Sequence, residues 1–84
     1  MESVLVTIRF ESQNYEYDLE IPVNLTANLL IQKLKSFFIS KGVNINGEKN
    51  YLIKIESQSR ILNPDETIEE AGIWDGMVIA VFES

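Results

Sequence analysis

The chain has 84 residues, of which 45% are hydrophobic, and this length and composition favour one packed domain over residues 1–84. Its 13 acidic and 7 basic residues give a net charge of −6, which disfavours binding to nucleic acid or to anionic membranes. There is no cysteine, no signal-peptide pattern at Met1-Glu2-Ser3 and no apolar run of the roughly 20 residues that span a bilayer, so we expect a cytoplasmic protein.

The N-terminal quarter predicts an antiparallel β-hairpin. A period of two in residues 4–10 puts four large apolar side chains on one face, namely Val4, Val6, Ile8 and Phe10. After a turn at residues 12–14, residues 15–21 alternate in the same way. Their tyrosines, Leu19 and Ile21 face inward, and an acidic row of Glu16, Asp18 and Glu20 faces water. Pro22 ends the hairpin, because proline cannot donate to the ladder.

The next segment has the period of an amphipathic helix. Asn24 or Thr26 is a plausible N-cap, and Lys41-Gly42 provides the end. The apolar stripe predicted to face the core consists of Ala27, Leu30, Ile31, Leu34, Phe37 and Phe38. Leu29 and Ile39 fall outside this stripe and form a second, weaker candidate surface, although Ile39 could instead pack under the following loop.

The second half predicts shorter elements. A polar loop with Asn46-Gly47 covers residues 43–50 and leads to a third strand at 51–56, in which Ile53 and Ile55 face inward. A short fourth strand at 60–62 and a turn at 63–66 follow. Thr67-Ile68-Glu69-Glu70 matches a capping box and indicates one short helical turn. Asp75-Gly76 then turns the chain into a last strand at 77–82.

These elements predict an α+β domain with two layers. One amphipathic helix covers one face of one mixed sheet, and no second long helix is left to cover the other face. A ferredoxin-like fold would need that second helix.

No residue pattern indicates catalysis, a cofactor or a metal. The chain has no histidine, its acids lie at water-facing or turn positions, and its glycines are isolated. The acidic group of Asp65, Glu66, Glu69 and Glu70 lacks the spacing of a calcium loop, so we interpret it as a solvated edge. Trp74 has two interpretations: an anchor for a partner, or a ring half-packed over the short helical turn, which we favour.

Residues 64–76, which include Gly72-Ile73-Trp74-Asp75-Gly76, resemble the second half of a ubiquitin-like β-grasp domain. The order of elements in the first half agrees. This resemblance implies a mixed five-stranded sheet in the order 2-1-5-3-4. Within that superfamily, residues 17–22 are similar to the YukD/EsaB family of type VII secretion systems. The narrower resemblance implies a cytosolic accessory or regulatory component that binds a protein partner, either a cytoplasmic or a membrane component of the apparatus.

Two alternatives remain. A protein modifier or sulfur carrier would use a terminal Gly-Gly, which this sequence lacks after Gly76, so we expect no conjugation. The chain could also be an interaction domain excised from a larger protein, although the start at Met1 argues weakly against this.

The resemblance also implies a binding surface on the uncovered face of the sheet. The residues expected to contact a partner are Leu5, Leu52, Lys54, Val78, Ala80 and Phe82. Their apolar members would form a strip rimmed by the acidic row of the hairpin. Lys54 replaces the central aliphatic residue of ubiquitin's own patch, so readers of ubiquitin should not recognise this face. The alternative is that these residues are scattered exposed apolar side chains, which are common.

Overall fold

The structure is a computed structural model that describes residues 2–12, 14–43, 45 and 49–84. Asn46-Gly47 of the predicted polar loop and Gln13 of the predicted hairpin turn lie outside the described residues. In chain order the elements are β1 (Ser3–Phe10), β2 (Tyr15–Pro22), α1 (Ala27–Ser40), β3 (Tyr51–Ile55), the 3₁₀ helix η1 (Glu56–Gln58), β4 (Arg60–Ile61) and β5 (Val78–Glu83).

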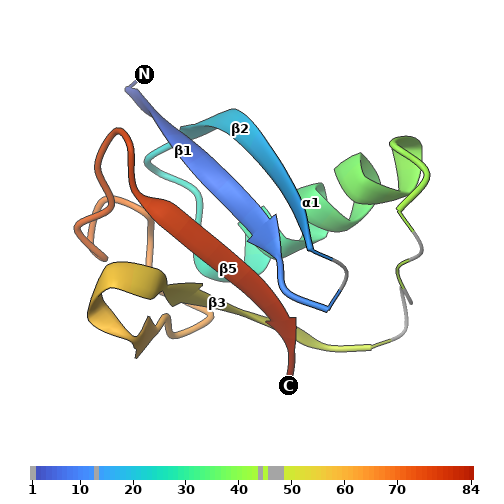
Figure 1. The fold of residues 1–84 in the computed structure, drawn as a ribbon. Helices are drawn as coiled ribbons and strands as arrows, with labels where there is room; N and C mark the ends of the chain where they lie inside the picture. Colours follow the sequence, from blue (N-terminus) through green and yellow to red (C-terminus); the bar gives the residue numbers. More distant parts are fainter. Residues whose placement is uncertain (1, 13, 44, 46–48) are drawn as a thin grey trace.

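The strands form a five-stranded sheet in the order β2-β1-β5-β3-β4, as predicted (Figure 1). β1 and β2 pair antiparallel over their whole length, from Ser3 opposite Pro22 to Phe10 opposite Tyr15. β5 lies between β1, to which it is parallel, and β3, to which it is antiparallel. The last strand of the chain is therefore the centre of the sheet.

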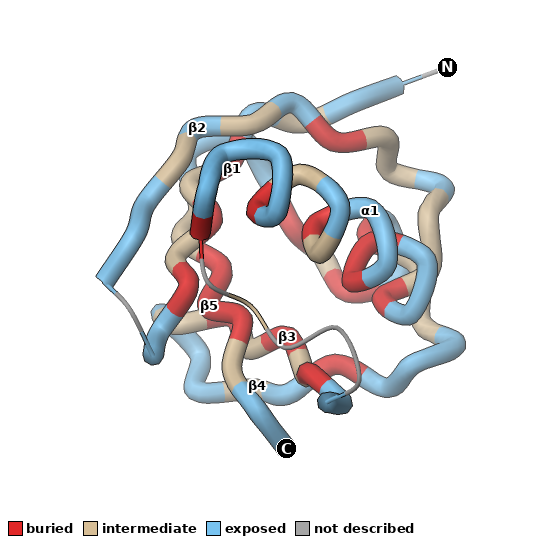
Figure 2. The backbone as a smooth tube through the Cα atoms, turned by 90° about the vertical axis from the view of Figure 1, so that its right-hand side faces the viewer, coloured by how far each residue is buried: buried red, intermediate tan, exposed pale blue. Residues whose placement is uncertain are grey.

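The helix α1 crosses one face of this sheet, and the core lies between the two layers (Figure 2). Thr26 is the N-cap, and its Oγ1 accepts a hydrogen bond of 3.2 Å from the backbone N–H of Leu29. The predicted stripe is confirmed, with only Phe37 remaining half-buried. The ring of Phe38 lies 5.3 Å from that of Phe10 between centroids, which joins the helix to β1.

Several local details differ from the expectations, among them β4, which ends at Ile61, and β5, which runs from Val78 to Glu83. The third strand ends at Ile55, and Glu56 begins η1, whose C-cap Ser59 has the left-handed backbone (φ 50°) that reverses the chain into β4. Tyr15 was expected to face the core but is exposed. It occupies the hairpin end of β2, and the tyrosine that meets the helix is Tyr17, whose ring packs edge-on against Phe37 at 5.2 Å.

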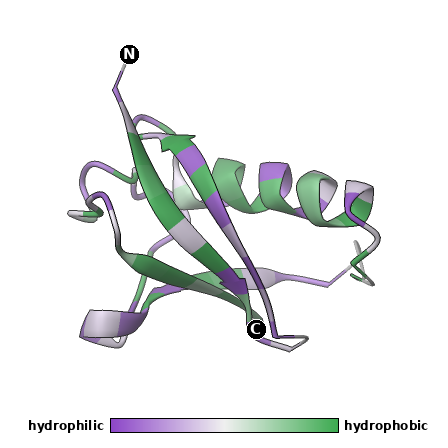
Figure 3. Ribbon diagram, turned by 45° about the horizontal axis from the view of Figure 1, so that its top comes forward, coloured by the Kyte–Doolittle hydropathy of each residue, from purple (hydrophilic) through white to green (hydrophobic). Residues whose placement is uncertain are grey.

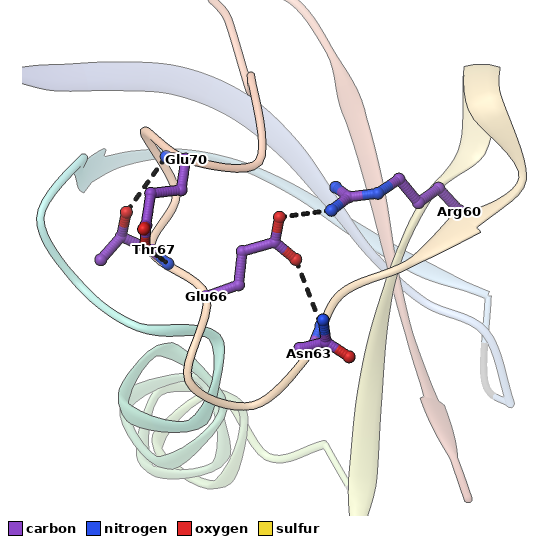
Figure 4. A network of polar contacts seen from close by, with 5 residues as sticks. All are labelled: Arg60, Asn63, Glu66, Thr67 and Glu70. Atoms are coloured by element: carbon purple, nitrogen blue, oxygen red, sulfur yellow. Dashed lines mark hydrogen bonds and ion pairs between the residues drawn. The ribbon is translucent and has the colours of Figure 1, made fainter.

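The segment after β4 forms the predicted capped turn (Figure 4). The Thr67 N–H donates to Glu70 Oε1 at 2.9 Å, and the Glu70 N–H donates to Thr67 Oγ1 at 3.0 Å. The turn is tied to the start of α1, because the backbone N–H of Ala27 donates to the Glu66 carbonyl at 2.8 Å. This connection holds the capped turn against the N-terminal end of α1.

Candidate protein-binding face

The face of the sheet opposite α1 carries the side chains that the sequence assigned to partner binding. We call it the open face (Figure 3). The strand register places its residues in rows: Thr7 lies beside Val78, Arg9 beside Ala80, Ala80 beside Lys54, and Leu52 beside Phe82. The predicted contact residues on β3 and β5 are thus neighbours, and Leu5 lies further along β1.

Ion pairs cross the centre of the open face. The Arg9 guanidinium on β1 pairs with the Glu56 carboxylate at the start of η1, which spans the intervening strand β5. Lys54 on β3 also reaches across β5, towards the residue that follows β1. Its Nζ lies 3.8 Å from Glu11 Oε2. The same ammonium lies 5.7 Å from the ring centroid of Phe82. The centre of the face is therefore charged.

This arrangement corrects one predicted contact residue. Ala80 has an exposed fraction of 0%, although it is not part of the core cluster beneath α1. Its small methyl group lies between Arg9 and Lys54, whose longer side chains cover it. A partner therefore cannot touch Ala80, and the continuous apolar strip that the sequence suggested is interrupted there.

What remains is an apolar area on either side of the charged centre. Leu52 and Phe82 lie directly opposite one another and are half-buried, with Lys54 above the Phe82 ring. On the opposite side of the charged centre, Leu5 is 54% exposed and Val78 is half-buried. The acidic row of Glu16, Asp18 and Glu20 lies exposed along β2, as predicted. Asp18 Oδ1 accepts a hydrogen bond of 2.7 Å from the Thr7 hydroxyl.

Exposed apolar side chains also occur away from the open face. Trp74 is 70% exposed, so the favoured interpretation of a ring half-packed over the capped turn is wrong. Leu29 and Ile39 on α1 are exposed as expected for side chains outside the core stripe, and part of the loop under which Ile39 could have packed lies outside the described residues. Ile61 on β4 is also exposed, and because it pairs with Lys54 it belongs to the open face; the sequence did not single it out.

Two members of the acidic group after β4, Glu66 and Glu70, are held by local bonds. Glu66 pairs with Arg60 and accepts a hydrogen bond from the Asn63 N–H (Figure 4). The Thr67 N–H, and secondarily the Thr67 hydroxyl, hold the pKa of Glu70 below its ordinary value. Within the described ranges, no three histidine, cysteine or acidic side chains are grouped so as to hold a metal ion. No helix in those ranges has the length and apolar character needed to cross a bilayer.

The fold and the strand order define a ubiquitin-like β-grasp protein. More narrowly, the chain belongs to the YukD family: the family model described as "WXG100 protein secretion system (Wss), protein YukD" matches residues 4–81. No curated protein gives a significant match.

Solved structures with the same fold include three informative cases. A chain of a toluene 4-monooxygenase complex with 4-bromobenzoate has a TM-score of 0.83 and 18% identity, covering 99% of this chain and 100% of that one. The ubiquitin-like domain of the Mycobacterium tuberculosis type VII secretion protein EccD1 has a TM-score of 0.74 and 16% identity, over 98% and 99%. The ubiquitin of Caldiarchaeum subterraneum has a TM-score of 0.72 and 18% identity, over 99% and 95%. At these identities, the likeness shows the fold alone.

Proposed function

We propose that this protein is a non-catalytic, cytoplasmic binding module of a type VII secretion system, which docks reversibly on a component of the apparatus through its open face. The observation that carries the proposal is the match of the YukD family model to residues 4–81. The sheet supports it, because α1 covers one face, and Leu52, Phe82 and Lys54 on the other face are only half-buried. In this mechanism the partner binds without covalent attachment.

The contacts on the open face indicate what such a partner would offer. An apolar side chain of the partner would cover Leu52 and Phe82, which are only half-buried in the isolated chain. A partner carboxylate would displace Glu11 from Lys54, since their separation of 3.8 Å is near the limit for an ion pair and Glu11 is partly solvated. Leu5 and Val78 would extend the contact along the sheet, and Ala80 would remain beneath Arg9 and Lys54.

The proposal is tested by placing a photo-cross-linking amino acid at position 82 in cells that contain the complete secretion system. Mass spectrometry should identify the cross-linked protein as a component of that system. The same amino acid at position 29, an exposed leucine on α1, is the matched control and should give no such product. Equal products from both positions would argue against docking through the open face.

A secretion assay in a deletion strain provides the functional measurement. Wild-type protein and Leu29→Asp should restore export of type VII substrates, and Phe82→Asp should not. Circular dichroism and thermal melting of both variants must match the wild type. Intact-mass analysis of the protein purified from cells should give the mass of the unmodified chain. A mass increase that maps to Ser84 would instead indicate a modifier or sulfur carrier.

A further inference from the structure

The most exposed large apolar side chain of the described residues belongs to Trp74, in the turn that precedes β5. Beside it lies a pocket of about 220 Å³, which we call the Trp74 pocket. Its apolar wall is formed by Val4, Val23 and Ile73, and its charged residues are Glu2 and Glu69. Strand β1 supplies Val4 to this pocket, whereas the neighbouring residue Leu5 points to the open face.

The size of the Trp74 pocket indicates what kind of group it accepts. Sites for cofactors and drug-sized ligands usually enclose roughly 300–1,000 Å³. A pocket of about 220 Å³ that opens beside a tryptophan is too small for such a ligand but has space for one large side chain. Tryptophan is one of the residue types enriched among the energetic anchors of protein interfaces. These features favour a peptide segment as the occupant.

The charges around the pocket indicate the chemistry of that segment. Every charged residue that lines it is acidic, and neither Glu2 nor Glu69 forms an ion pair with another described residue. A second pocket, lined in part by Leu5, has Asp18 and Asp75 as its charged residues, but both of these carboxylates already accept hydrogen bonds from β1. A cation beside Glu2 and Glu69 gains Coulomb energy, and a guanidinium can also stack on the exposed indole ring.

We propose that the Trp74 pocket is a second docking site, which binds a protein segment carrying an arginine next to a large aliphatic or aromatic side chain. The apolar side chain fills the space between Val4, Val23 and Ile73. The arginine stacks on Trp74 and pairs with Glu69. This site is separate from the centre of the open face, so it allows the module to hold two segments at once and to link them.

The experiment begins with a library of short random peptides displayed on phage. The library is selected on the wild-type protein after depletion on Trp74→Ala, a variant expected to fold normally because the ring is 70% exposed. Enriched peptides should contain an arginine beside a large apolar residue. Failure to enrich any peptide, or enrichment of acidic peptides, would overturn the proposal.

Affinities are then measured by the fluorescence anisotropy of a labelled enriched peptide. Trp74→Ala should weaken binding roughly tenfold or more, and Glu69→Gln should weaken it a few-fold. Glu16→Gln is the matched control, since it removes one exposed charge from the hairpin end of β2 and should leave the affinity unchanged. Equal losses in the two glutamine variants would indicate only general attraction to an acidic protein and would contradict the proposed site.

The location of binding is read from the intrinsic fluorescence of Trp74, the only tryptophan of the chain, and from methyl chemical shifts. The peptide should shift the Trp74 emission to shorter wavelength and move the methyl signals of Val4, Val23 and Ile73. Shifts confined to Leu52 and Val78 would place the peptide on the open face and refute the assignment. A blue shift caused by raising the protein concentration alone would identify a second copy of the chain as the occupant, and would also refute it.

Discussion

Arg9 reaches across the central strand of the sheet to Glu56, and the ion pair lies over the open-face side of β5 next to Ala80. Arg9 belongs to the strand on one side of β5, and Glu56 follows the strand on the other side. The ion pair therefore connects β1 to the beginning of η1, two elements that are not paired with each other in the sheet. It also separates the Leu5 end of the open face from the end formed by Leu52 and Phe82. A partner of this face therefore meets charge at its centre and apolar side chains on either side.

The strength of this ion pair can be measured by a double-mutant cycle of Arg9→Met and Glu56→Gln in urea unfolding. Both side chains are about a third exposed, so solvent screening limits the coupling energy to about 0.5–1 kcal/mol. The pair of Lys49 with Glu83 is more exposed and provides the control, with an expected coupling near zero. Adding salt should reduce the Arg9–Glu56 coupling. Equal coupling energies in the two cycles would show that the central position of Arg9 and Glu56 does not strengthen their ion pair.

The two single variants of that cycle should differ. Arg9 Nε is buried and has no hydrogen-bond partner among the described residues, so Arg9→Met also removes an existing desolvation cost. Glu56→Gln leaves the guanidinium without its carboxylate and gains nothing in return. We expect Glu56→Gln to destabilise the protein more than Arg9→Met does, and the same urea experiments measure both. The reverse order would contradict this account of the Arg9 side chain.

Periodicity was sufficient to predict the layers of this fold but not the details of its open face. The stripe of α1 and the alternation in β1 predicted which residues form the core, because 3.6- and 2-residue periods leave few alternatives. The burial of Ala80 depends instead on the long side chains of Arg9 and Lys54 on neighbouring strands, whose conformations no local pattern specifies. Likewise, the sequence shows that Trp74 lies in a turn but not that its ring points to solvent.

Leu29 and Leu30 are adjacent on α1 and provide a matched test of the core. Leu30 is 1% exposed, and Leu29 is 47% exposed. Leu30→Ala should lower the free energy of unfolding by about 2–5 kcal/mol, because it removes buried methyl groups and leaves a cavity. Leu29→Ala should change it by less than about 0.5 kcal/mol. Urea unfolding measures both, and similar losses would contradict the orientation of α1.

Position 76 favours glycine because of its backbone conformation, and not because a side chain there would clash with a neighbour. Its φ is +87°, a Cβ at this position would meet no heavy atom within 4 Å, and its N–H donates to the Leu5 carbonyl at 2.8 Å. Gly76→Ala should therefore cost about 1–2 kcal/mol in the free energy of unfolding, from left-handed backbone strain alone. Gly76→Asn should cost less, because asparagine adopts this conformation more readily. Equal costs for the two substitutions would point to a steric cause instead.

Glu70 gives the capped turn a defined dependence on pH. Hydrogen bonds from Thr67 stabilise the carboxylate and hold the pKa of Glu70 below its reference value of 4.5. A lowered pKa in the folded state means that the stabilisation is fully present above pH 4.5 and is lost as the pH falls through the folded value. Carbon-detected NMR titration should show the Glu70 carboxyl protonating with a midpoint below pH 4.5.

The stability measurement for the same turn uses Glu70→Gln, which keeps the shape of the side chain and removes its charge. The wild type should be more stable than this variant by a constant amount above pH 4.5, since the ionised carboxylate accepts the Thr67 N–H more strongly than an amide oxygen does. The difference should shrink as the solution is acidified and Glu70 becomes protonated. Glu16→Gln is the control, because it removes one exposed carboxylate from β2, a position that no hydrogen bond among the described residues joins to the capped turn. A difference between wild type and Glu70→Gln that is independent of pH would mean that the carboxylate charge does not stabilise the turn.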